Sequence, residues 1–188
     1  DTLSLHDALP ILVAGAPGAG KSTLLADVLA GGGRMIGDDL TVAKAPNGPT
    51  DVWQLMPGRT SMRLHPDTMA RVPHLRREAV PEDDRGKWLI WPEARVINLP
   101  GPISGLVWLD DGPTGRMAAR DRLAAAEAML FRPRLHQLMP GHAVRRRQIL
   151  EWAAAIPAFR MAPLRQFDED ARKRRLDDIV QFTADVRA

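Results

Sequence analysis

Residues 15–23 read Gly15-Ala16-Pro17-Gly18-Ala19-Gly20-Lys21-Ser22-Thr23 and match the phosphate-loop pattern G-x-x-x-x-G-K-[ST] at every fixed position. The apolar run at 11–14 precedes this segment and predicts a buried strand. Leucines and a valine follow it at helical spacing, at positions 24, 25, 28 and 29. The motif therefore lies between a predicted strand and a predicted helix, which is the context that a phosphate loop requires.

The residue types of this segment suit the binding of a nucleoside triphosphate. Glycines let successive backbone N–H groups turn towards a polyphosphate, and the start of the following helix adds the positive end of its dipole. We expect Lys21 to bridge the β- and γ-phosphates and Ser22 to place its hydroxyl on Mg²⁺. ATP and Mg²⁺ are the predicted cofactors, and the whole segment from Gly15 to Thr23 is the predicted binding surface.

The composition is that of an ordinary globular protein. The 188 residues are 45% hydrophobic and 26% charged, which suits one domain with a sizeable core. The chain has no cysteine, which excludes disulfides, thiolate metal sites and a cysteine nucleophile and fits a reducing compartment. No apolar run approaches the roughly 20 residues that span a bilayer. We therefore expect a cytoplasmic protein with no membrane partner.

The beginning of the chain departs from the rest. Residues 1–9 look like a translated sequencing adapter, and they lack the basic and long apolar regions of a secretory signal. We expect them to be a non-native leader and residues 10–188 to form a single domain.

Turn signals divide the next part of the chain. We expect a short strand at 34–37 that leads to Asp38-Asp39, an extended segment at 40–43, and a turn at 45–49 followed by a strand at 52–55. This pattern predicts a hairpin and not a βαβ crossover. A proline opens a predicted helix at 66–71, and residues 73–87 suggest an exposed loop.

The remaining segments alternate between strand and helix patterns. Strands are predicted at 87–91, 103–109 and 159–161. Apolar residues at helical spacing predict helices through 123–130, 149–156 and 176–183. The result is an α/β fold with a mixed sheet and helices packed towards the carboxy-terminal end.

Two acidic pairs compete for the second half of the site. Phosphoryl transfer needs a carboxylate near Mg²⁺ and a group that accepts the proton of the attacking hydroxyl. Asp110-Asp111 follows the strongly apolar strand at 103–109, as a Walker B aspartate would, whereas Asp38-Asp39 follows a weaker strand. A turn is the alternative interpretation of each pair, and it is the favoured one for Asp110-Asp111-Gly112.

A resemblance favours the first pair. The spacing from Lys21 to Asp38-Asp39 resembles that of the HPr kinase/phosphorylase family, in which a Gly/Ala-Asp-Asp motif follows the phosphate loop. The segments at 57–68, 86–88 and 156–161 look like the short kinase-like relatives of that family. The resemblance covers roughly residues 11–170, and its specific motifs lie within 15–39. It implies a P-loop fold similar to the carboxy-terminal domain of HPr kinase.

The resemblance also implies roles for individual residues. Asp38 would be the general base towards a serine hydroxyl, and Asp39 would orient it or hold Mg²⁺ together with Ser22; the assignment between the two aspartates stays open. Lys21 completes the predicted catalytic set. The chain departs from the family at Glu93-Ala94-Arg95-Val96, which lacks the glycines of a family motif involved in phosphorylase activity.

The other charged and polar residues can also be explained without a role in function. The basic runs at 145–147 and 172–175 fit solvated helix faces better than a nucleic-acid surface, so no nucleic-acid partner is expected. Lys87, Arg59 and Arg63 could steady a transferring phosphate or be ordinary surface charges. The histidines show no metal-ligand spacing.

The sequence thus predicts an ATP- and Mg²⁺-dependent kinase that phosphorylates a serine of a protein or peptide. Two alternatives stay open: a small-molecule kinase that uses Asp110 as its Walker B acid, and a non-catalytic nucleotide-sensing module. The oligomeric state is also open, a homo-oligomer included.

Overall fold

The computed structural model describes residues 10–48, 50–72, 80–81, 86–92, 96–130, 140–164 and 168–187. Along the chain the elements are β1 (Ile11–Gly15), α1 (Lys21–Ala30), β2 (Val42–Lys44), β3 (Gln54–Met56), β4 (Met62–Leu64), α2 (Pro66–Arg71), β5 (Val80–Pro81), β6 (Trp88–Ile90), β7 (Gly101–Pro102), β8 (Gly105–Leu109), β9 (Gly115–Arg116), α3 (Ala119–Ala128), α5 (His142–Ala155), β10 (Ala158–Met161) and α6 (Glu169–Arg187).

The central sheet has the strand order β1-β8-β10-β9. β8 pairs in parallel with β1 on one side and with β10 on the other, and β9 pairs antiparallel with β10. The register sets Ile11 opposite Gly105 and Gly15 opposite Leu109, so β1 and β8 end at the same edge of the sheet. The predicted α/β class with a mixed sheet is confirmed.

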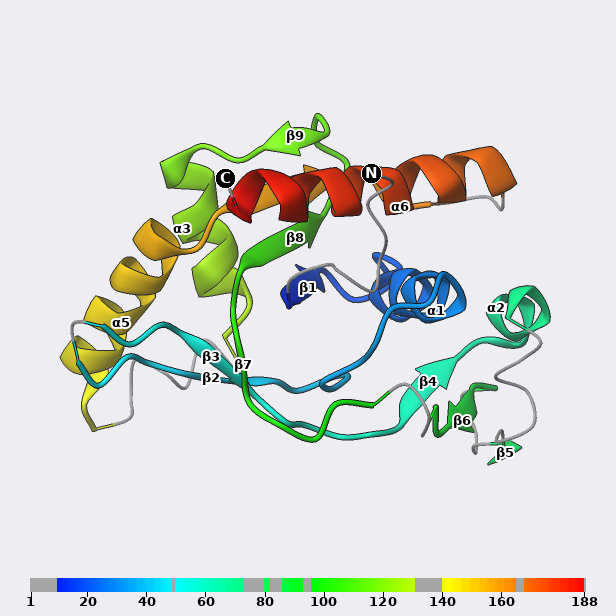
Figure 1. The fold of residues 1–188 in the computed structure, drawn as a ribbon, viewed down its shortest axis with the longest axis horizontal. Coiled ribbons are helices and arrows are strands. Elements are labelled where there is room, and N and C mark those ends of the chain that lie inside the picture. The colour runs from blue at the N-terminus through cyan, green and yellow to red at the C-terminus, as the bar shows by residue number, and fades with distance from the viewer. Residues whose placement is uncertain are drawn as a thin grey trace.

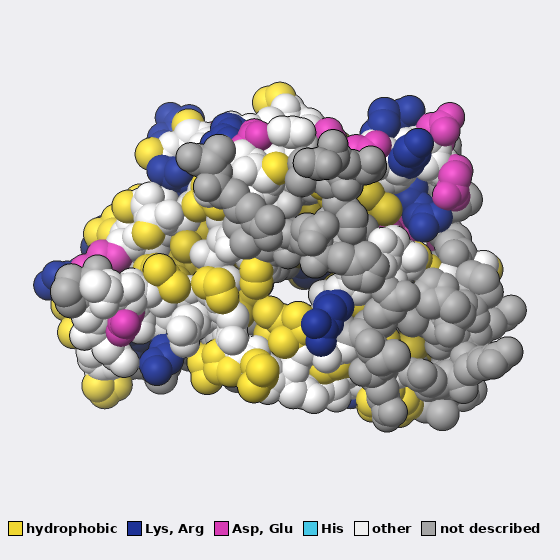
Figure 2. Space-filling model, in the orientation of Figure 1, with side chains coloured by type: hydrophobic (Ala, Val, Ile, Leu, Met, Phe, Trp, Pro, Cys, Tyr) yellow, Lys and Arg dark blue, Asp and Glu magenta, His cyan; other side chains and the backbone are white. Residues whose placement is uncertain are grey.

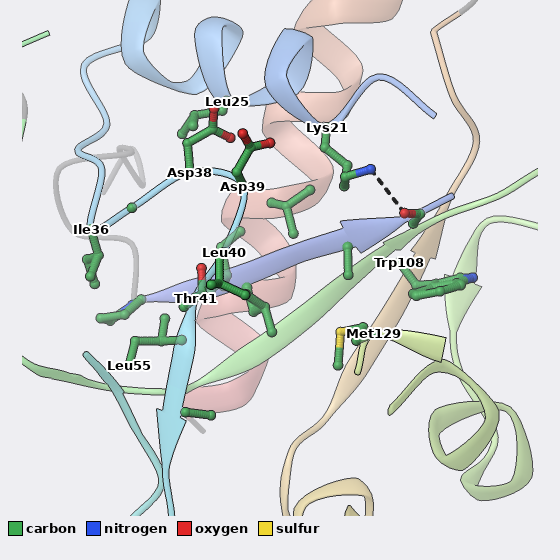
Figure 3. Close-up of a pocket in the computed structure, with 18 of the residues that line it drawn as sticks. Lys21, Leu25, Ile36, Asp38, Asp39, Leu40, Thr41, Leu55, Trp108 and Met129 are labelled. Carbon is green, nitrogen blue, oxygen red and sulfur yellow. Dashed lines mark hydrogen bonds between the residues drawn. The ribbon is translucent and has the colours of Figure 1, made fainter. Parts of the chain in front are cut away.

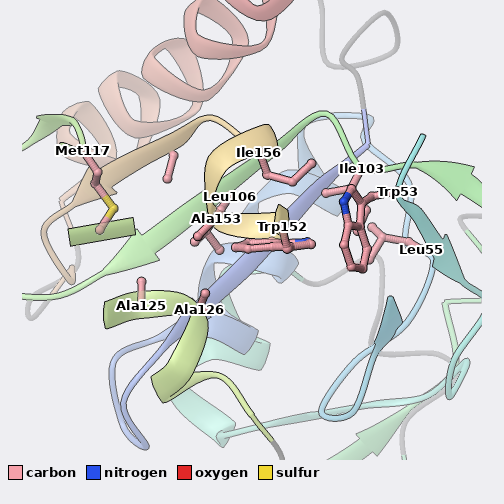
Figure 4. Packing of buried hydrophobic residues seen from close by; sticks show 12 residues of the cluster. Trp53, Leu55, Ile103, Leu106, Met117, Ala125, Ala126, Trp152, Ala153 and Ile156 are labelled. Atoms are coloured by element: carbon pink, nitrogen blue, oxygen red, sulfur yellow. The ribbon is translucent and has the colours of Figure 1, made fainter. Parts of the chain in front are cut away.

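Helices cover both faces of this sheet (Figure 1). On one face, Leu24 of α1 and Ile179 and Phe182 of α6 pack on Val107 and Leu109 of β8. On the other face, Ala125 of α3 and Trp152 of α5 belong to the cluster that includes Leu106 (Figure 4). Leu106 and Val107 are adjacent in one strand and point to opposite faces, so β8 is buried on both sides, as a continuous apolar run predicts.

Two small sheets complete the described structure. β2, β3 and β7 form one with the order β2-β3-β7, and β4, β6 and β5 form the other with the order β4-β6-β5. β2 pairs antiparallel with β3 through Val42–Met56, Ala43–Leu55 and Lys44–Gln54, which confirms the predicted hairpin. The sheet of β4 packs against α1, because Met62 and Leu64 share a cluster with Ala26 and Leu29.

Several predicted elements need correction. Residues 34–37 do not form a strand: Met35 makes only an isolated parallel bridge to Val96. The predicted loop at 73–87 lies largely outside the described residues, but Val80–Pro81 pairs with β6. The short strands β4, β7 and β9 were not predicted, since two or three residues carry too little periodicity to be recognised.

The basic run at 172–175 is only in part the solvated face that its composition predicts, because Lys173 and Arg174 are exposed whereas Arg172 and Arg175 are not. Arg172 forms an ion pair with Asp27 of α1, with Nε 3.2 Å from Oδ1, and Asp27 is 3% exposed. Arg175 is also buried, and its Nε donates to Met161 Sδ at 3.3 Å. Arg172 thus joins α6 to α1, and Arg175 joins α6 to β10. Among the described residues, no helix combines the length and apolar character needed to cross a bilayer.

Candidate functional site

The segment at 15–23 connects β1 to α1 as the motif requires. Gly18 and Gly20 have φ angles of 82° and 86°, in the left-handed region that a residue with a Cβ adopts at a cost. Gly20 is the N-cap of α1, so the first backbone N–H groups of the helix have no carbonyl partner within it. The loop therefore ends at an array of N–H donors with the positive end of the helix dipole, which suits an anion.

Lys21 is turned back towards the loop. Its Nζ donates to the carbonyl oxygens of Gly15 and Ala16, each at 3.0 Å, and Figure 3 draws one of these bonds. An ammonium has three N–H donors, so these two bonds fix its position and leave a third donor for a phosphate oxygen.

Asp38 and Asp39 lie on a segment whose backbone contacts the loop at residues 58–59. The backbone of Asp38 forms an antiparallel bridge with Arg59, and the Gly58 N–H donates to the Ile36 carbonyl at 3.0 Å. A Cβ on Gly37 would lie 3.1 Å from the Gly58 Cα, so the two backbones approach more closely than most side chains allow without a small shift. The Gly37–Gly58 contact therefore sets the position of the acidic pair.

Asp39 has an unusual backbone conformation. Its φ of 62° makes it the one non-glycine residue with a positive φ among those that the structure describes. Aspartate tolerates this region better than most residues, but the conformation still costs free energy, and such strain clusters at functional sites. The carboxylate of Asp39 lies 3.7 Å from Arg63 Nη1 in an ion pair that is more than half exposed on the aspartate side.

Burial raises the pKa of Asp38 above its ordinary value, and the charge of Asp39 raises it further. Hydrogen bonds from the backbone N–H groups of Asp39 and Arg63 and the charge of Arg59 act in the opposite direction. A carboxylate with a raised pKa is a stronger base, which suits a group that accepts a proton near neutral pH.

A cavity of about 730 Å³ brings these residues together. It runs along β1, which lies at the edge of the central sheet as described, and Figure 2 shows the hollow at the centre of the molecule. Lys21 and Ser22 line it from α1, and Asp38 and Asp39 line it from the segment that faces them (Figure 3). The predicted catalytic residues therefore share one cavity.

Not every residue of the predicted binding surface lines this cavity. Gly15, Lys21 and Ser22 do, whereas residues 16–18 are exposed to solvent and do not line it. Thr23 turns away from it, and its Oγ1 lies 3.5 Å from Oγ1 of Thr68 in α2. Ala19 packs against the hydrophobic cluster around Leu24.

The residues fit the binding of Mg²⁺ together with a nucleotide. Ser22 and Asp39 offer a hydroxyl and a carboxylate, which with phosphate oxygens and water is a common set of magnesium ligands. Within the described ranges, no cluster of three or more His, Asp and Glu side chains could hold a metal ion by itself. The predicted pair would thus complete a coordination sphere that the phosphates supply in large part.

Asp110 has a different environment from that of Asp38. Its Oδ2 accepts from Trp108 Nε1 at 2.8 Å, and its Oδ1 accepts from the Gly112 N–H at 2.8 Å. Arg160 Nε lies 3.0 Å from the same Oδ1. Asp110 does not line the cavity. These contacts agree with the turn that was the favoured interpretation of this segment.

The sequence did not indicate Gly37 or Gly58 as parts of the site, or Arg160 as a partner of Asp110. Arg160 lies 50 residues after Asp110, and only the pairing of β10 with β8 brings the two together. The two glycines could have been found from their positions in the sequence. Gly37 directly precedes Asp38-Asp39, and Gly58 lies within the segment at 57–68. None of the three predicted phosphate-steadying residues lines the cavity. Arg63 forms the ion pair with Asp39, and Arg59 donates from Nε to Ser61 Oγ at 2.6 Å. The Glu93-Ala94-Arg95 segment lies outside the described residues.

Comparisons with protein-family models, with curated proteins and with solved structures found no match to this chain. The motif at 15–23 and the geometry of the cavity are therefore the features of this chain that bear on its function.

Proposed function

We propose that this protein is an ATP- and Mg²⁺-dependent kinase that transfers the γ-phosphate to a serine hydroxyl of a protein or peptide, on a P-loop fold similar to the carboxy-terminal domain of HPr kinase. One observation carries the proposal. Lys21 and Ser22 of the phosphate-loop motif line the same cavity as Asp38 and Asp39, whereas Asp110 lies outside it.

Each residue has a defined role in the proposed reaction. The N–H groups at the start of α1 and the ammonium of Lys21 hold the β- and γ-phosphates. Asp38 accepts the proton of the serine hydroxyl as its oxygen bonds to the γ-phosphorus, and the bond to the β–γ bridging oxygen breaks to release ADP. Bound through Ser22 and Asp39, Mg²⁺ would neutralise charge on the phosphate oxygens.

The test is transfer of labelled γ-phosphate from ATP to proteins and peptides of a bacterial lysate, with the modified residues mapped by mass spectrometry. We expect phosphoserine that requires both Lys21 and Asp38, tested with Lys21→Met and Asp38→Asn. Label found only in small molecules, and lost with Asp110→Asn, would show a small-molecule kinase. Tight ATP binding with no transfer to any fraction would show a nucleotide-sensing module.

A further inference from the structure

The cavity continues beyond the acidic pair into a hydrophobic compartment. We define this compartment by six lining residues that come from the β2–β3 hairpin, the end of α3 and α5: Ala43, Trp53, Leu55, Met129, Ile149 and Trp152. Trp53, Leu55 and Trp152 are 8%, 3% and 6% exposed, so they belong to the packed core and form fixed walls (Figure 4). Arg145 and Gln148 of α5 are the polar residues that line this end.

The direction of phosphate transfer relates this compartment to the acceptor. The attacking and leaving oxygens lie roughly in line across the γ-phosphorus. Lys21 marks the side of the β- and γ-phosphates, and Asp38 marks the side from which the hydroxyl attacks. The lining continues from Asp38 and Asp39 along Leu40 and Thr41 to Ala43, so the compartment connects to the acceptor side through the hairpin.

The rest of the nucleotide has another place to lie. Residues 16–18 at the tip of the phosphate-loop segment are exposed and do not line the cavity. A triphosphate held with its γ-phosphate towards Asp38 therefore carries its sugar and base towards this open side. A cavity of about 730 Å³ is larger than a serine side chain and a phosphate group require, which leaves the hydrophobic compartment for another part of the acceptor.

We infer that this compartment binds a large apolar side chain next to the serine that is phosphorylated, so that the acceptor is a peptide segment with an aromatic or aliphatic neighbour to its serine. The inference depends on the proposed function for the identity of the acceptor. Burial of such a side chain removes apolar surface from water and holds the hydroxyl beside Asp38. The compartment is thus a specificity pocket of the same site.

Two neighbouring residues of β2 provide a matched pair of variants. Ala43 pairs with Leu55 and lines the cavity, whereas Val42 is 58% exposed and does not line it. Alternate residues of a strand point to opposite sides, so Ala43→Phe fills the compartment and Val42→Phe adds the same ring outside it. Ala43 is itself exposed to solvent, which limits the risk to folding. Ala128→Phe, at the end of α3, fills the cavity from another element and serves as the second test.

The experiment measures binding of blocked tripeptides by titration calorimetry, with Mg²⁺ and a non-hydrolysable ATP analogue present. The peptides are acetyl-Phe-Ser-Phe-amide, acetyl-Gly-Ser-Gly-amide and acetyl-Asp-Ser-Asp-amide. We expect the phenylalanine peptide to bind about tenfold to a hundredfold more tightly than the glycine peptide, as burial of one phenyl ring implies. Ala43→Phe and Ala128→Phe should abolish this preference with the ATP analogue bound as before, and Val42→Phe should retain it.

Equal affinity for the phenylalanine and glycine peptides would overturn the inference, as would a preference for the aspartate peptide, which would point to recognition by Arg145. Weaker binding of the ATP analogue to Ala43→Phe, with the peptide preference unchanged, would show that the compartment holds the base. Phosphate transfer without a peptide preference would reject the pocket and keep the kinase. A preference that Ala43→Phe removes, in a protein that transfers no phosphate, would support the pocket and reject the kinase.

Discussion

Asp38-Asp39 and Asp110-Asp111 are alike in sequence and differ in what surrounds them. Asp110 follows β8, a strand buried on both faces, and its carboxylate is held by Trp108, Gly112 and Arg160. Asp38 follows an irregular segment with a single bridge, yet it lines the cavity beside Lys21. A position at the end of a buried strand therefore does not make a carboxylate available for chemistry, because neighbouring donors decide whether it can meet a substrate.

The comparison predicts its largest difference in phosphate transfer. We expect Asp38→Asn to lower kcat by about a hundredfold to ten-thousandfold, the usual contribution of a general base. Asp110→Asn should leave the transfer rate of the folded protein within about threefold, because Asp110 does not line the cavity. Steady-state kinetics at saturating ATP measures both variants. A larger loss of kcat in Asp110→Asn than in Asp38→Asn would identify Asp110 as the catalytic aspartate.

The free energy of unfolding should show the opposite order. A substitution at Asp110 should lower it more than a substitution at Asp38. Asp110→Ala removes one of the two carboxylates, with that of Asp121, that form ion pairs with Arg160, and it leaves the Trp108 N–H without its acceptor. We expect the free energy of unfolding to fall by about 1–3 kcal/mol, the cost of unsatisfied buried groups. Urea unfolding measures it, with the exposed Asp178→Ala of α6 as the control. An Asp110→Ala protein as stable as this control would show that the contacts of Asp110 are not structural.

The raised pKa of Asp38 predicts that the rate of phosphate transfer depends on pH. Burial raises this pKa above the ordinary value of 3.8, so the ionised form is disfavoured in the folded protein. Transfer should therefore decline on acidification, with a midpoint above pH 3.8 that is absent from the residual activity of Asp38→Asn.

The raised pKa of Asp38 also predicts how the stability of the protein changes with pH. Below pH 3.8 the carboxyl is protonated in both the folded and the unfolded chain, and it carries no penalty. As the pH rises through the raised pKa, the wild type loses stability that Asp38→Asn keeps. The thermal stability of Asp38→Asn should therefore exceed that of the wild type at neutral pH, and the gain should vanish in acid. A gain that is independent of pH would contradict the assignment.

The smallest expected effect concerns the backbone of Asp39. Glycine adopts a φ of 62° without strain, so Asp39→Gly should raise the free energy of unfolding by up to about 1 kcal/mol. The ion pair with Arg63 is too exposed to offset this gain by much. Asp39→Asn is the matched variant, because asparagine also tolerates this conformation and removes only the charge. Both variants should need more Mg²⁺ for half-maximal transfer, whereas only Asp39→Gly should be more stable.

The sequence predicted those parts of the molecule that local patterns determine. Residues 66–71 form a helix opened by proline, and the hairpin of β2 and β3 forms between turn residues, as expected. The position of Asp38 was not a local property: it depends on Gly58, which contacts Gly37 across an irregular segment. The state of Asp110 depends on Arg160, which a parallel strand pairing brings to it. Such long-range contacts carry no periodicity, so a single sequence does not reveal them.

The ion pair between Asp27 and Arg172 has a consequence for the order of biosynthesis. Asp27 belongs to α1, which follows the phosphate-loop segment, and Arg172 belongs to α6, which the ribosome makes much later. Before α6 emerges, α1 lacks this ion pair, and Leu24 of α1 lacks the contacts of Ile179 and Phe182 that cover it in the complete chain. We therefore expect a nascent chain that ends before α6 to fold α1 poorly, so that the segment at 15–23, although synthesised early, reaches its final structure only when the last helix docks.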